Sequence, residues 1–283
     1  MSPPNVASMS PPPQRILIVG GASGIGAAIT TALVRTSNAQ VFCFDKSIDY
    51  SSSGPLGSLL SYSNRMYGHE ADVTIPDERE EAVATCLRKD VLGGIDTVIY
   101  CAGVMTPIQR VQDVDMASVE MAYSVNVFGA MAMAQLTLPH LRAARRANPL
   151  HAGFGKIIFL TSACDESVTC HGWAPYCSSK AALRRFISCL AHEEPGISVQ
   201  GVSPKLTRTS MIADVVGGKF KGIMADHEVE RYRLWGQAGA GMIDPPERCG
   251  EAVAKLARGL YEGGKSGETL DYEDHVPKTM GRI

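Results

Sequence analysis

The chain has 283 residues, of which 45% are hydrophobic and 20% are charged, and its formal net charge is −2. These values suit one large globular domain or two small ones with an ample buried core. Because the charges are interspersed, the sequence offers no basic face for phosphates and no acidic tail, so nucleic acid is not an expected partner. The eight cysteines form no CxxC pair. They favour reduced thiols in an intracellular protein and predict no metal site.

Residues 1–14 are rich in proline, lack a cationic start and contain no apolar run of signal-peptide length. We expect them to form a disordered tail. No apolar stretch of the chain approaches the roughly 20 residues that a membrane-spanning helix requires. The sequence therefore predicts a cytoplasmic protein with no membrane partner.

From residue 15 onward, short apolar runs alternate with longer segments of helical periodicity, as in a parallel sheet covered by helices on both faces. We predict a single α/β domain over residues 15–283, a doubly wound Rossmann fold with a seven-stranded parallel sheet. The segment Pro204–Gly241 has weak periodicity and several glycines, which predicts a substrate lid at about residues 205–241. The expected strands are Ile16–Val19, Gln40–Phe44, Met66–Glu70, Thr97–Cys101, Lys156–Leu160, Ser198–Val202 and Glu268–Leu270. The expected helices are Gly24–Thr36, Asp77–Asp90, Val119–Ala147, Ala174–Glu193 and Pro245–Tyr261.

A glycine-rich loop follows the first expected strand directly and leads into the first expected helix. Glycines allow a tight turn and a close approach of the backbone, and the helix start supplies N–H donors, so this arrangement is typical of a pyrophosphate-binding loop. The alternative is a flexible turn of small residues, which the strand-to-helix context disfavours. The loop residues predicted to bind a dinucleotide are Gly20, Ala22, Ser23, Gly24, Ile25 and Gly26.

An aspartate, Asp45, ends the second expected strand, where a carboxylate can accept hydrogen bonds from ribose hydroxyls and repel a 2′-phosphate. Ser23 is not basic and precedes Gly24, so neither obvious phosphate-binding position is cationic. Lys46 can soften this discrimination, and a solvated loop aspartate is the alternative. The pattern favours NAD over NADP.

Two further strand ends carry small or acidic residues at the same expected edge of the sheet. Asp72 and Val73 follow the third strand, and Cys101, Ala102 and Gly103 follow the fourth. A carboxylate there can meet an adenine amino group, and small residues let the backbone lie against a ribose. Each feature alone is ordinary turn chemistry, and they indicate a cofactor site only as an ordered set.

The expected chemical centre contains Ser162 at the end of the fifth strand and Tyr176 and Lys180 at the start of the next helix. Residues four apart share one face of a helix. A phenol titrates near pH 10, so it needs a nearby positive charge to exchange a proton near neutrality. Lys180 is placed to supply that charge, and Ser162 can hold a substrate oxygen. For an isolated Tyr-x-x-x-Lys pattern, the alternative is a pair on an amphipathic surface.

The ordered motifs resemble the short-chain dehydrogenase/reductase family over roughly residues 15–272. The resemblance implies hydride transfer between a nicotinamide and a carbonyl or secondary alcohol, with Tyr176 as the general acid/base. It adds Asn126 to the site, where the family implies a kinked helix and a water held next to Lys180. It also implies a homodimer or homotetramer built on the two long helices. The motifs that carry it are Gly20, Gly24 and Gly26, Asp45, Asp72, Ala102-Gly103, Asn126, Ser162, Tyr176 and Lys180.

More narrowly, the segments 172–182 and 104–108 resemble the sepiapterin reductase-like and benzil reductase-like branch, including its fungal members, which reduces ketones and diketones. The segment Pro204–Thr209 resembles the family's segment beside the nicotinamide, which implies cofactor contacts from Pro204, Thr207 and Thr209. Lys205 replaces a glycine there. It either alters cofactor approach and attracts an anionic substrate, or it points to solvent.

Two other departures from the family pattern concern bracing and spacing. Val19 replaces a threonine, and Tyr100-Cys101 replaces two asparagines, which affects packing more than chemistry. Ser162 lies one residue farther from Tyr176 than is usual in the family, so Thr161 is an alternative partner.

Substrate contacts are expected from residues 104–108, 164–173 and 209–235. Met211, Ile212, Phe220 and Met224 make the lid apolar, which favours a small hydrophobic carbonyl or alcohol as substrate. Two other functions remain open. One is a non-catalytic dinucleotide-binding sensor or scaffold, and the other is an enzyme of this fold that acts on an imine or as a dehydratase.

Overall fold

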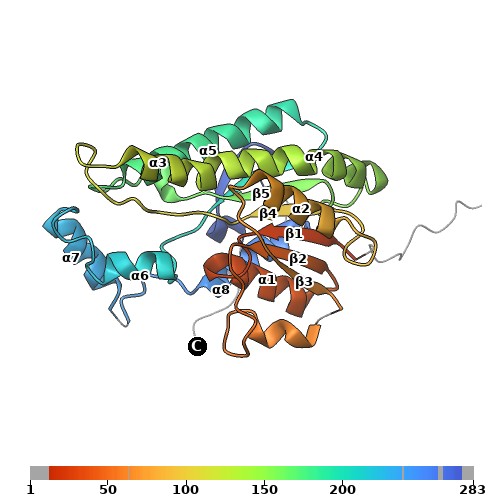
Figure 1. The fold of residues 1–283 in the computed structure, drawn as a ribbon, viewed down its shortest axis with the longest axis horizontal. Helices are drawn as coiled ribbons and strands as arrows, with labels where there is room; N and C mark the ends of the chain where they lie inside the picture. The colour runs from red at the N-terminus through yellow and green to blue at the C-terminus, as the bar shows by residue number, and fades with distance from the viewer. Residues whose placement is uncertain (1–12, 63, 238, 261–263, 276–283) are drawn as a thin grey trace, which may run out of the picture.

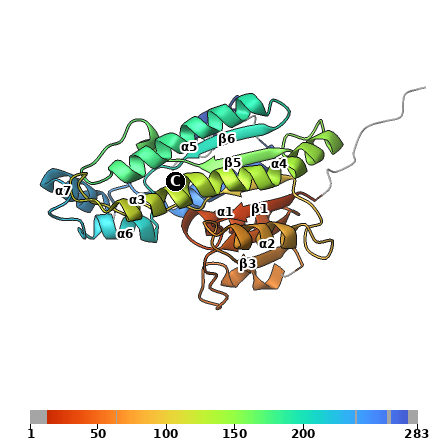
Figure 2. The ribbon, with the colours of Figure 1, turned by 45° about the horizontal axis from the view of Figure 1, so that its top comes forward.

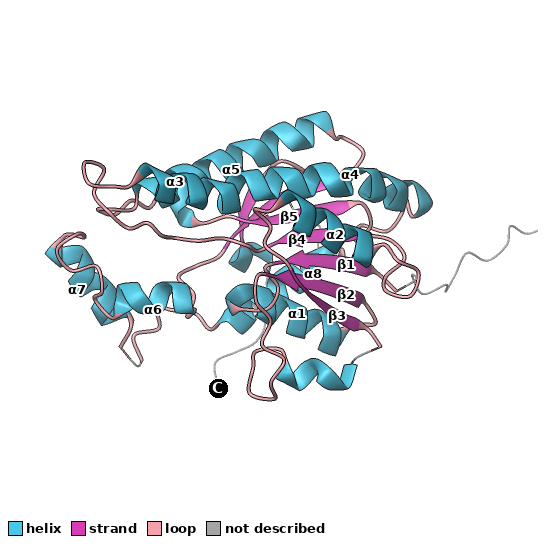
Figure 3. Ribbon diagram, in the orientation of Figure 1, coloured by secondary structure: helices cyan, strands magenta, loops and turns pink. Residues whose placement is uncertain are grey.

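Seven strands form one parallel sheet in the order β3-β2-β1-β4-β5-β6-β7, which confirms the predicted single doubly wound domain (Figure 3). The structure, a computed structural model, describes residues 13–62, 64–237, 239–260 and 264–275. The strands are β1 (Arg15–Val19), β2 (Gln40–Asp45), β3 (Met66–Glu70), β4 (Thr97–Tyr100), β5 (Lys156–Leu160), β6 (Ser198–Ser203) and β7 (Thr269–Asp271).

Helices cover both faces of the sheet, and two more lie beyond one end of it (Figure 1). The α-helices are α1 (Gly24–Thr36), α2 (Pro76–Cys86), α3 (Met116–Tyr123), α4 (Ala130–Ala147), α5 (Ala174–Glu193), α6 (Ser210–Val216), α7 (Asp226–Trp235) and α8 (Pro246–Ala257). Short 3₁₀ turns cover Gly57–Tyr62, Ala163–Asp165 and Tyr272–His275.

Strand β1 shows how the core divides between the two faces. Ile16 and Ile18 pack with α1 and α8, whereas Leu17 and Val19 pack with α2, α4 and α5. This alternation follows from the two-residue period of a strand, and all four side chains are fully buried because helices lie on both sides. The central strand therefore has no solvent-facing side, which explains its uninterrupted apolar sequence.

The expected single helix Val119–Ala147 begins earlier, at Met116, and contains an irregular turn. Residues Ser124–Gly129 form a π-helical turn between α3 and α4, and the three segments run as one rod across the sheet (Figure 2). The hydroxyl of Tyr100, fully buried in β4, donates a hydrogen bond of 2.6 Å to the carbonyl of Val125 in this turn. Tyr100, one of the departures from the family pattern, thus satisfies a carbonyl in the irregular turn.

Other predicted boundaries also need correction. The helix expected over Asp77–Asp90 spans Pro76–Cys86, and the one expected over Pro245–Tyr261 spans Pro246–Ala257. Strand β4 ends one residue early because the amides of Cys101 and Ala102 both donate to the carbonyl of Val19, at 2.8 and 3.0 Å.

The N-terminal segment joins the domain before β1. Residues 1–12 of the expected tail lie outside the described residues, but Gln14 is buried and its side-chain amide donates to the carbonyl of Ala257 at 3.2 Å. Gln14 thus packs into the domain. Within the described part of the chain, no helix is both long and apolar enough to cross a membrane.

The expected lid contains two helices, α6 and α7, that its weak periodicity did not predict. They extend past the end of the sheet (Figure 1). A third apolar cluster, separate from the two that cover the sheet, lies beneath them and includes Trp173, Met224 and Tyr232. The lid is therefore packed through a shared apolar cluster against the loop after β4 and the start of α5.

Replacing Tyr100 with phenylalanine tests the role of its hydroxyl. Tyr100→Phe leaves the partly buried Val125 carbonyl without this donor, so we expect the free energy of unfolding to fall by about 1–3 kcal/mol in urea denaturation. Tyr50→Phe is the matched control, because the Tyr50 side chain is 49% exposed and no hydrogen bond of its hydroxyl is found among the described residues. A loss below roughly 0.5 kcal/mol for Tyr100→Phe would show that the hydroxyl does not stabilise the π-helical turn.

Candidate active site

A cavity of about 410 Å³ opens at the carboxyl end of the strands, where β1 and β4 lie side by side and the strand order reverses. In open α/β sheets this is where ligands bind. We call it the edge cavity. Fifteen of the predicted site residues line it: Gly20, Ser23, Gly24, Ile25, Gly26, Asp45, Asp72, Val73, Cys101, Ala102, Gly103, Tyr176, Lys180, Pro204 and Thr209.

The glycine-rich loop forms one wall of the edge cavity, and its shape excludes larger residues. Gly20 has φ +75°, and a Cβ on Gly26 would lie 1.9 Å from the carbonyl oxygen of Gly20. Ser23 makes no capping hydrogen bond at the start of α1, and the first turn of that helix has no acidic side chain. The loop thus presents a helix N-terminus without a capping side chain to the cavity, which fits a pyrophosphate group.

Asp45 lies at the end of β2 and is held by two backbone amides. Its Oδ2 accepts from the Ala22 amide at 2.9 Å, and its Oδ1 accepts from the Lys46 amide at 2.8 Å. Ala22 does not line the cavity, although it was predicted to bind cofactor. Its amide instead fixes the carboxylate at the wall, where lone pairs remain for hydroxyl donors.

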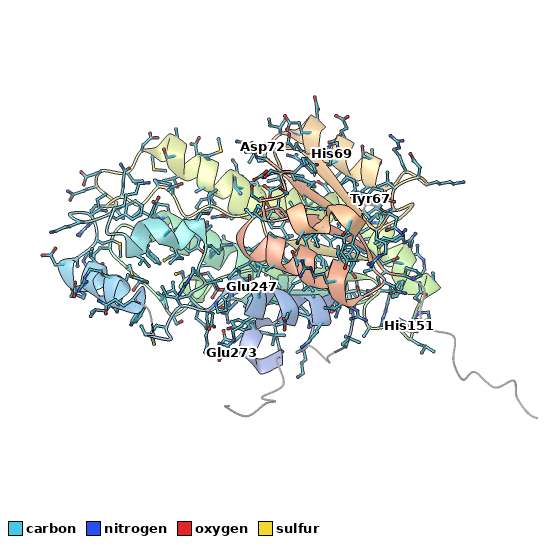
Figure 4. The ribbon with its side chains drawn as sticks, turned by 90° about the horizontal axis from the view of Figure 1, so that it is seen from below. Tyr67, His69, Asp72, His151, Glu247 and Glu273 are labelled. Carbon is cyan, nitrogen blue, oxygen red and sulfur yellow. The ribbon has the colours of Figure 1, made fainter. Side chains whose placement is uncertain are left out.

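Lys46 also lines the edge cavity, and its side chain turns to Asp72. Its Nζ lies 2.8 Å from Asp72 Oδ2, and its side chain is 79% exposed. Burial opposes ionisation of Asp72, but hydrogen bonds from Lys46 and Thr74 outweigh it and lower the pKa of the carboxyl. Figure 4 labels Asp72 at the surface of the ribbon. The cation nearest Asp45 in sequence is thus already paired with a carboxylate.

Tyr176 and Lys180 lie one turn apart at the start of α5, both buried, as their spacing predicts. The Lys180 ammonium lies 5.9 Å from the centre of the Tyr176 ring and donates to the Leu160 carbonyl at 2.9 Å. Burial lowers the pKa of Lys180 to about 8, against the opposing effect of nearby acidic groups. Burial also raises the pKa of Tyr176, and a hydrogen bond with Ser162 partly opposes this effect.

Ser162 lies beside Tyr176 and faces a second cavity. The serine hydroxyl also accepts from the Cys164 amide at 3.2 Å. Thr161, the alternative partner, lines the edge cavity and not the second one. The longer spacing between Ser162 and Tyr176 is therefore accommodated with the serine, not the threonine, at the second cavity.

Asn126 is fully buried within the π-helical turn and lines neither cavity, although it was predicted to contact the cofactor. Its Oδ1 accepts from the Val104 amide, and its Nδ2 donates to the Val104 carbonyl, both at 2.8 Å. Nδ2 also donates to the Ser179 hydroxyl at 2.9 Å. The side chain thus joins the loop after β4 to the helix that carries Tyr176 and Lys180.

The second cavity, which we call the lid pocket, has a volume of about 380 Å³ and lies between the sheet edge and helices α6 and α7. It shares five residues with the edge cavity: Ile25, Tyr176, Pro204, Thr209 and Met211. Tyr176 therefore faces both spaces. An arrangement of this kind lets one side chain contact ligands bound on either side of it.

The segment after β6 is divided between the two cavities. Pro204 and Thr209 line both, whereas Thr207 lines only the lid pocket and donates its hydroxyl to the Lys205 carbonyl at 2.7 Å. Thr209 also lies against the glycine loop, because a Cβ on Gly24 would lie 3.2 Å from its Cγ2. The start of the lid, at Thr209 just before α6, is therefore in contact with the glycine-rich loop.

Lys205 lines the lid pocket, but its ammonium pairs with Glu273 and the side chain is 51% exposed. Figure 4 labels Glu273 on the C-terminal segment, far from Asp72. The solvent-facing alternative considered for Lys205 agrees with this placement. Of the expected lid residues, Met211 and Ile212 line the pocket, whereas Phe220 and Met224 pack in the apolar cluster beneath the lid.

Three side chains of α7, Arg231, Tyr232 and Trp235, line the lid pocket and were not singled out from the sequence. The expected contact range contained them, but α7 is rich in charges and has no clear apolar stripe. Trp173 and Trp235 lie in the same wall. The sequence signal that could have found them is the pair of aromatic residues, Tyr232 and Trp235, that follows Arg231 within one helical turn.

Comparisons with known proteins agree with this geometry. A model of the short chain dehydrogenase family matches residues 14–218. An uncharacterised oxidoreductase of Saccharomyces cerevisiae is 27% identical over 270 residues, which are 92% of this chain and 95% of the relative. Its crystal structure has a TM-score of 0.81 at 24% identity and covers 93% of this chain and 100% of its own.

A benzil reductase of the same yeast, which forms (S)-benzoin, is 25% identical over 271 residues, 92% of this chain and 95% of the relative. The crystal structure of an NADH-dependent reductase complexed with NAD has the same fold, with a TM-score of 0.72 at 21% identity over 92% of this chain and 94% of that chain. The chain belongs to the short-chain dehydrogenase family and is an oxidoreductase of that family, as its motifs predicted.

The buried Lys180 ammonium is expected to reduce the stability of the fold. A pKa of about 8 against an ordinary value of 10.5 corresponds to roughly 3 kcal/mol of unfavourable burial. Lys180→Met also removes the hydrogen bond to the Leu160 carbonyl, and this loss destabilises the variant by about 1 kcal/mol. We therefore expect this variant to unfold with a free energy about 1–2 kcal/mol higher than the parent at neutral pH.

Because burial lowers the pKa of Lys180, the destabilisation should depend on pH. Below pH 8 the amine is charged in both the folded and unfolded states, so the full penalty applies, and it vanishes as pH rises from 8 to 10.5. Urea unfolding across this range should therefore show the advantage of Lys180→Met shrinking. Lys89→Met, at an exposed position, is the control. A constant difference between Lys180→Met and the parent would contradict a lowered pKa.

Proposed function

We propose that this oxidoreductase transfers a hydride between NAD(H) and a carbonyl or secondary alcohol, with Tyr176 as the general acid/base. The observation that carries the proposal is that Tyr176 faces both the edge cavity and the lid pocket. A phenol in this position can contact a substrate oxygen in the lid pocket while that substrate lies next to a cofactor in the edge cavity. The redox chemistry of a bound nicotinamide cofactor is the donation or acceptance of hydride.

Side chains of the protein supply the proton that the reduction requires. In the reducing direction, Tyr176 donates its phenolic proton to the oxygen of the carbonyl, and Ser162 donates a second hydrogen bond to the same oxygen. The ammonium of Lys180 stabilises the phenolate that remains. Because burial raises the pKa of Tyr176, the phenol is protonated at neutral pH and is ready for reduction.

Asn126 supports this chemistry from behind the cavities. Its hydrogen bonds hold the Val104 backbone against Ser179, the residue that precedes Lys180. We therefore assign it the role of a positioning residue that holds the loop after β4 in a fixed position relative to α5. The family-implied water next to Lys180 belongs to the same proposal.

The preference for NAD rests on the placement of Asp45. Its carboxylate is held at the wall of the edge cavity, where ribose hydroxyls can donate to it and a 2′-phosphate would meet a negative charge. Lys46 is paired with Asp72 and is not free to neutralise that charge. The NADH-dependent reductase with this fold offers a precedent for the same cofactor.

The assembly and location of the protein belong to the same proposal. Met116, Phe128 and Met131 are exposed apolar side chains along the α3–α4 rod, which supports a homodimer or homotetramer in which this face is covered. All eight cysteines are free thiols, which supports a reducing, cytoplasmic environment.

The primary test is the activity of Tyr176→Phe with NADH and a panel of ketones and diketones, including benzil. Loss of the acid/base group should lower kcat by about 10²–10⁴-fold while NADH binding, measured by fluorescence, is retained. Tyr50→Phe applies the same chemical change at an exposed position that lines neither cavity, and should leave kcat unchanged. NADH binding without turnover by the parent protein on any substrate would instead favour a dinucleotide sensor or scaffold.

A second test changes the cofactor preference. Asp45→Ala removes the carboxylate that faces the ribose, so the ratio of kcat/KM with NADH to kcat/KM with NADPH should fall by about 10–100-fold. Asp49→Ala, in the exposed loop that follows and outside both cavities, should leave the ratio unchanged. If the ratio were unaltered in Asp45→Ala, this aspartate would not select the cofactor.

A further inference from the structure

The lid pocket has an unusual distribution of charge. Its walls are largely apolar and aromatic, and among the described residues Lys205 and Arg231 are the only basic side chains in its lining. Within the part of the chain that the structure describes, no aspartate or glutamate lines it. Lys205 is paired outside the pocket with Glu273, so Arg231 is the cation left to act on a ligand.

The guanidinium of Arg231 is held by aromatic rings and lacks an acidic partner. Its central carbon lies 5.5 Å from the ring centre of Tyr232 and 5.3 Å from that of Trp235. Its Nη2 lies 3.6 Å from the sulfur of Cys170, a weak acceptor, and its Nε is buried without a hydrogen-bond partner among the described residues. A guanidinium has five donors, and here few of them are used.

The nearby carboxylates are engaged elsewhere. Glu228, one turn before Arg231 on α7, accepts from the His171 amide and ring and from the Ala225 amide. Glu230 forms an ion pair of 2.7 Å with Arg233. No ion pair of Arg231 occurs among the described residues, so its charge is not neutralised by this part of the chain.

A row of aromatic rings connects Arg231 with the proposed catalytic centre. The Trp173 ring lies edge-on to that of Tyr176, with centres 6.4 Å apart, and stacks on Tyr232 at 5.6 Å. Tyr232 is in turn covered by Arg231. A ligand that spans the pocket from Tyr176 to Arg231 would therefore lie along Trp173 and Tyr232.

We propose that Arg231 binds the carboxylate of an aromatic oxo acid whose ketone lies at Tyr176 and whose body lies against the aromatic wall. This proposal rests on the proposed function and specifies its substrate class. A carboxylate can accept two parallel hydrogen bonds from the guanidinium, and such charge-assisted pairs are stronger than hydrogen bonds between neutral groups. Because the rings of Trp173 and Tyr232 lie between Tyr176 and Arg231, the geometry favours an acid whose aromatic ring separates the ketone from the carboxylate.

The first experiment measures binding without turnover. The chain has two tryptophans, Trp173 and Trp235, and both line the lid pocket, so intrinsic fluorescence reports on this pocket alone. Phenylbutyrate and its neutral amide, phenylbutyramide, are titrated into the protein saturated with NADH. We expect the acid to bind about 10–100-fold more tightly than the amide.

Variants then assign the preference to one side chain. Arg231→Gln should abolish the preference for the acid, Arg231→Lys should retain part of it, and Lys205→Gln should retain it. Arg233→Gln is the matched control, since Arg233 lies on the same helix, pairs with Glu230 and does not line the pocket. Equal binding of acid and amide by the parent, or loss of the preference in Lys205→Gln with retention in Arg231→Gln, would overturn the proposal.

The second experiment measures turnover with the para-acetyl derivative of phenylbutyrate, in which the ring separates the ketone from the carboxylate, and with its methyl ester. Arg231→Gln should lower kcat/KM for the acid by about 10–100-fold, chiefly through KM, and change the value for the ester by less than about threefold. Thermal melts establish that each variant folds, and Arg231→Lys replaces Arg231→Gln if the latter does not. An equal loss for acid and ester would contradict carboxylate recognition.

The two experiments separate the two proposals. If no carbonyl compound is turned over but the acid binds through Arg231, then the proposed function fails and the anion-binding pocket stands. If ketones and the ester are reduced but the acid has no advantage that depends on Arg231, then the function stands and the substrate class is wrong.

Discussion

The buried amide of Asn126 is the interaction on which the geometry of the site depends. Its side-chain oxygen accepts from the Val104 amide, and its side-chain nitrogen donates to the Val104 carbonyl and to the Ser179 hydroxyl. Breaking these bonds would leave buried polar groups unpaired, at a cost of about 1–3 kcal/mol for each group. The loop that borders the edge cavity and the helix that carries Tyr176 and Lys180 are therefore held in one fixed relation.

The sequence predicted the strands, the glycine loop and the Tyr176–Lys180 pair because each depends on neighbours close along the chain. The π-helical turn did not follow from local pattern, since it depends on Tyr100 and Asn126 reaching other elements. Helix α7 was missed because its charges obscure the apolar stripe that periodicity detects. The unpaired state of Arg231 depends on the bonds that Glu228 and Glu230 make, and sequence spacing does not reveal them.

The two cavities that meet at Tyr176 differ in electrostatic character. The edge cavity has the carboxylates of Asp45 and Asp72 and the amines of Lys46 and Lys180, whereas the described residues that line the lid pocket include Lys205 and Arg231 and no carboxylate. The proposed acid/base group lies at the boundary, with a buried amine behind it whose pKa is lowered by that burial. Separate selection for two ligands can thus operate on either side of one phenol.

The contact between Gly24 and Thr209 has a consequence for how this enzyme can change over evolution. Thr209 immediately precedes α6, so the root of the lid rests on the loop that begins α1. The glycine-rich loop and the start of the lid are distant in the chain but packed together, and a side chain larger than that of glycine at position 24 would crowd Thr209. If the proposed function holds, a change in the loop that suits a different nucleotide would also displace the lid, so cofactor preference and substrate preference would change together.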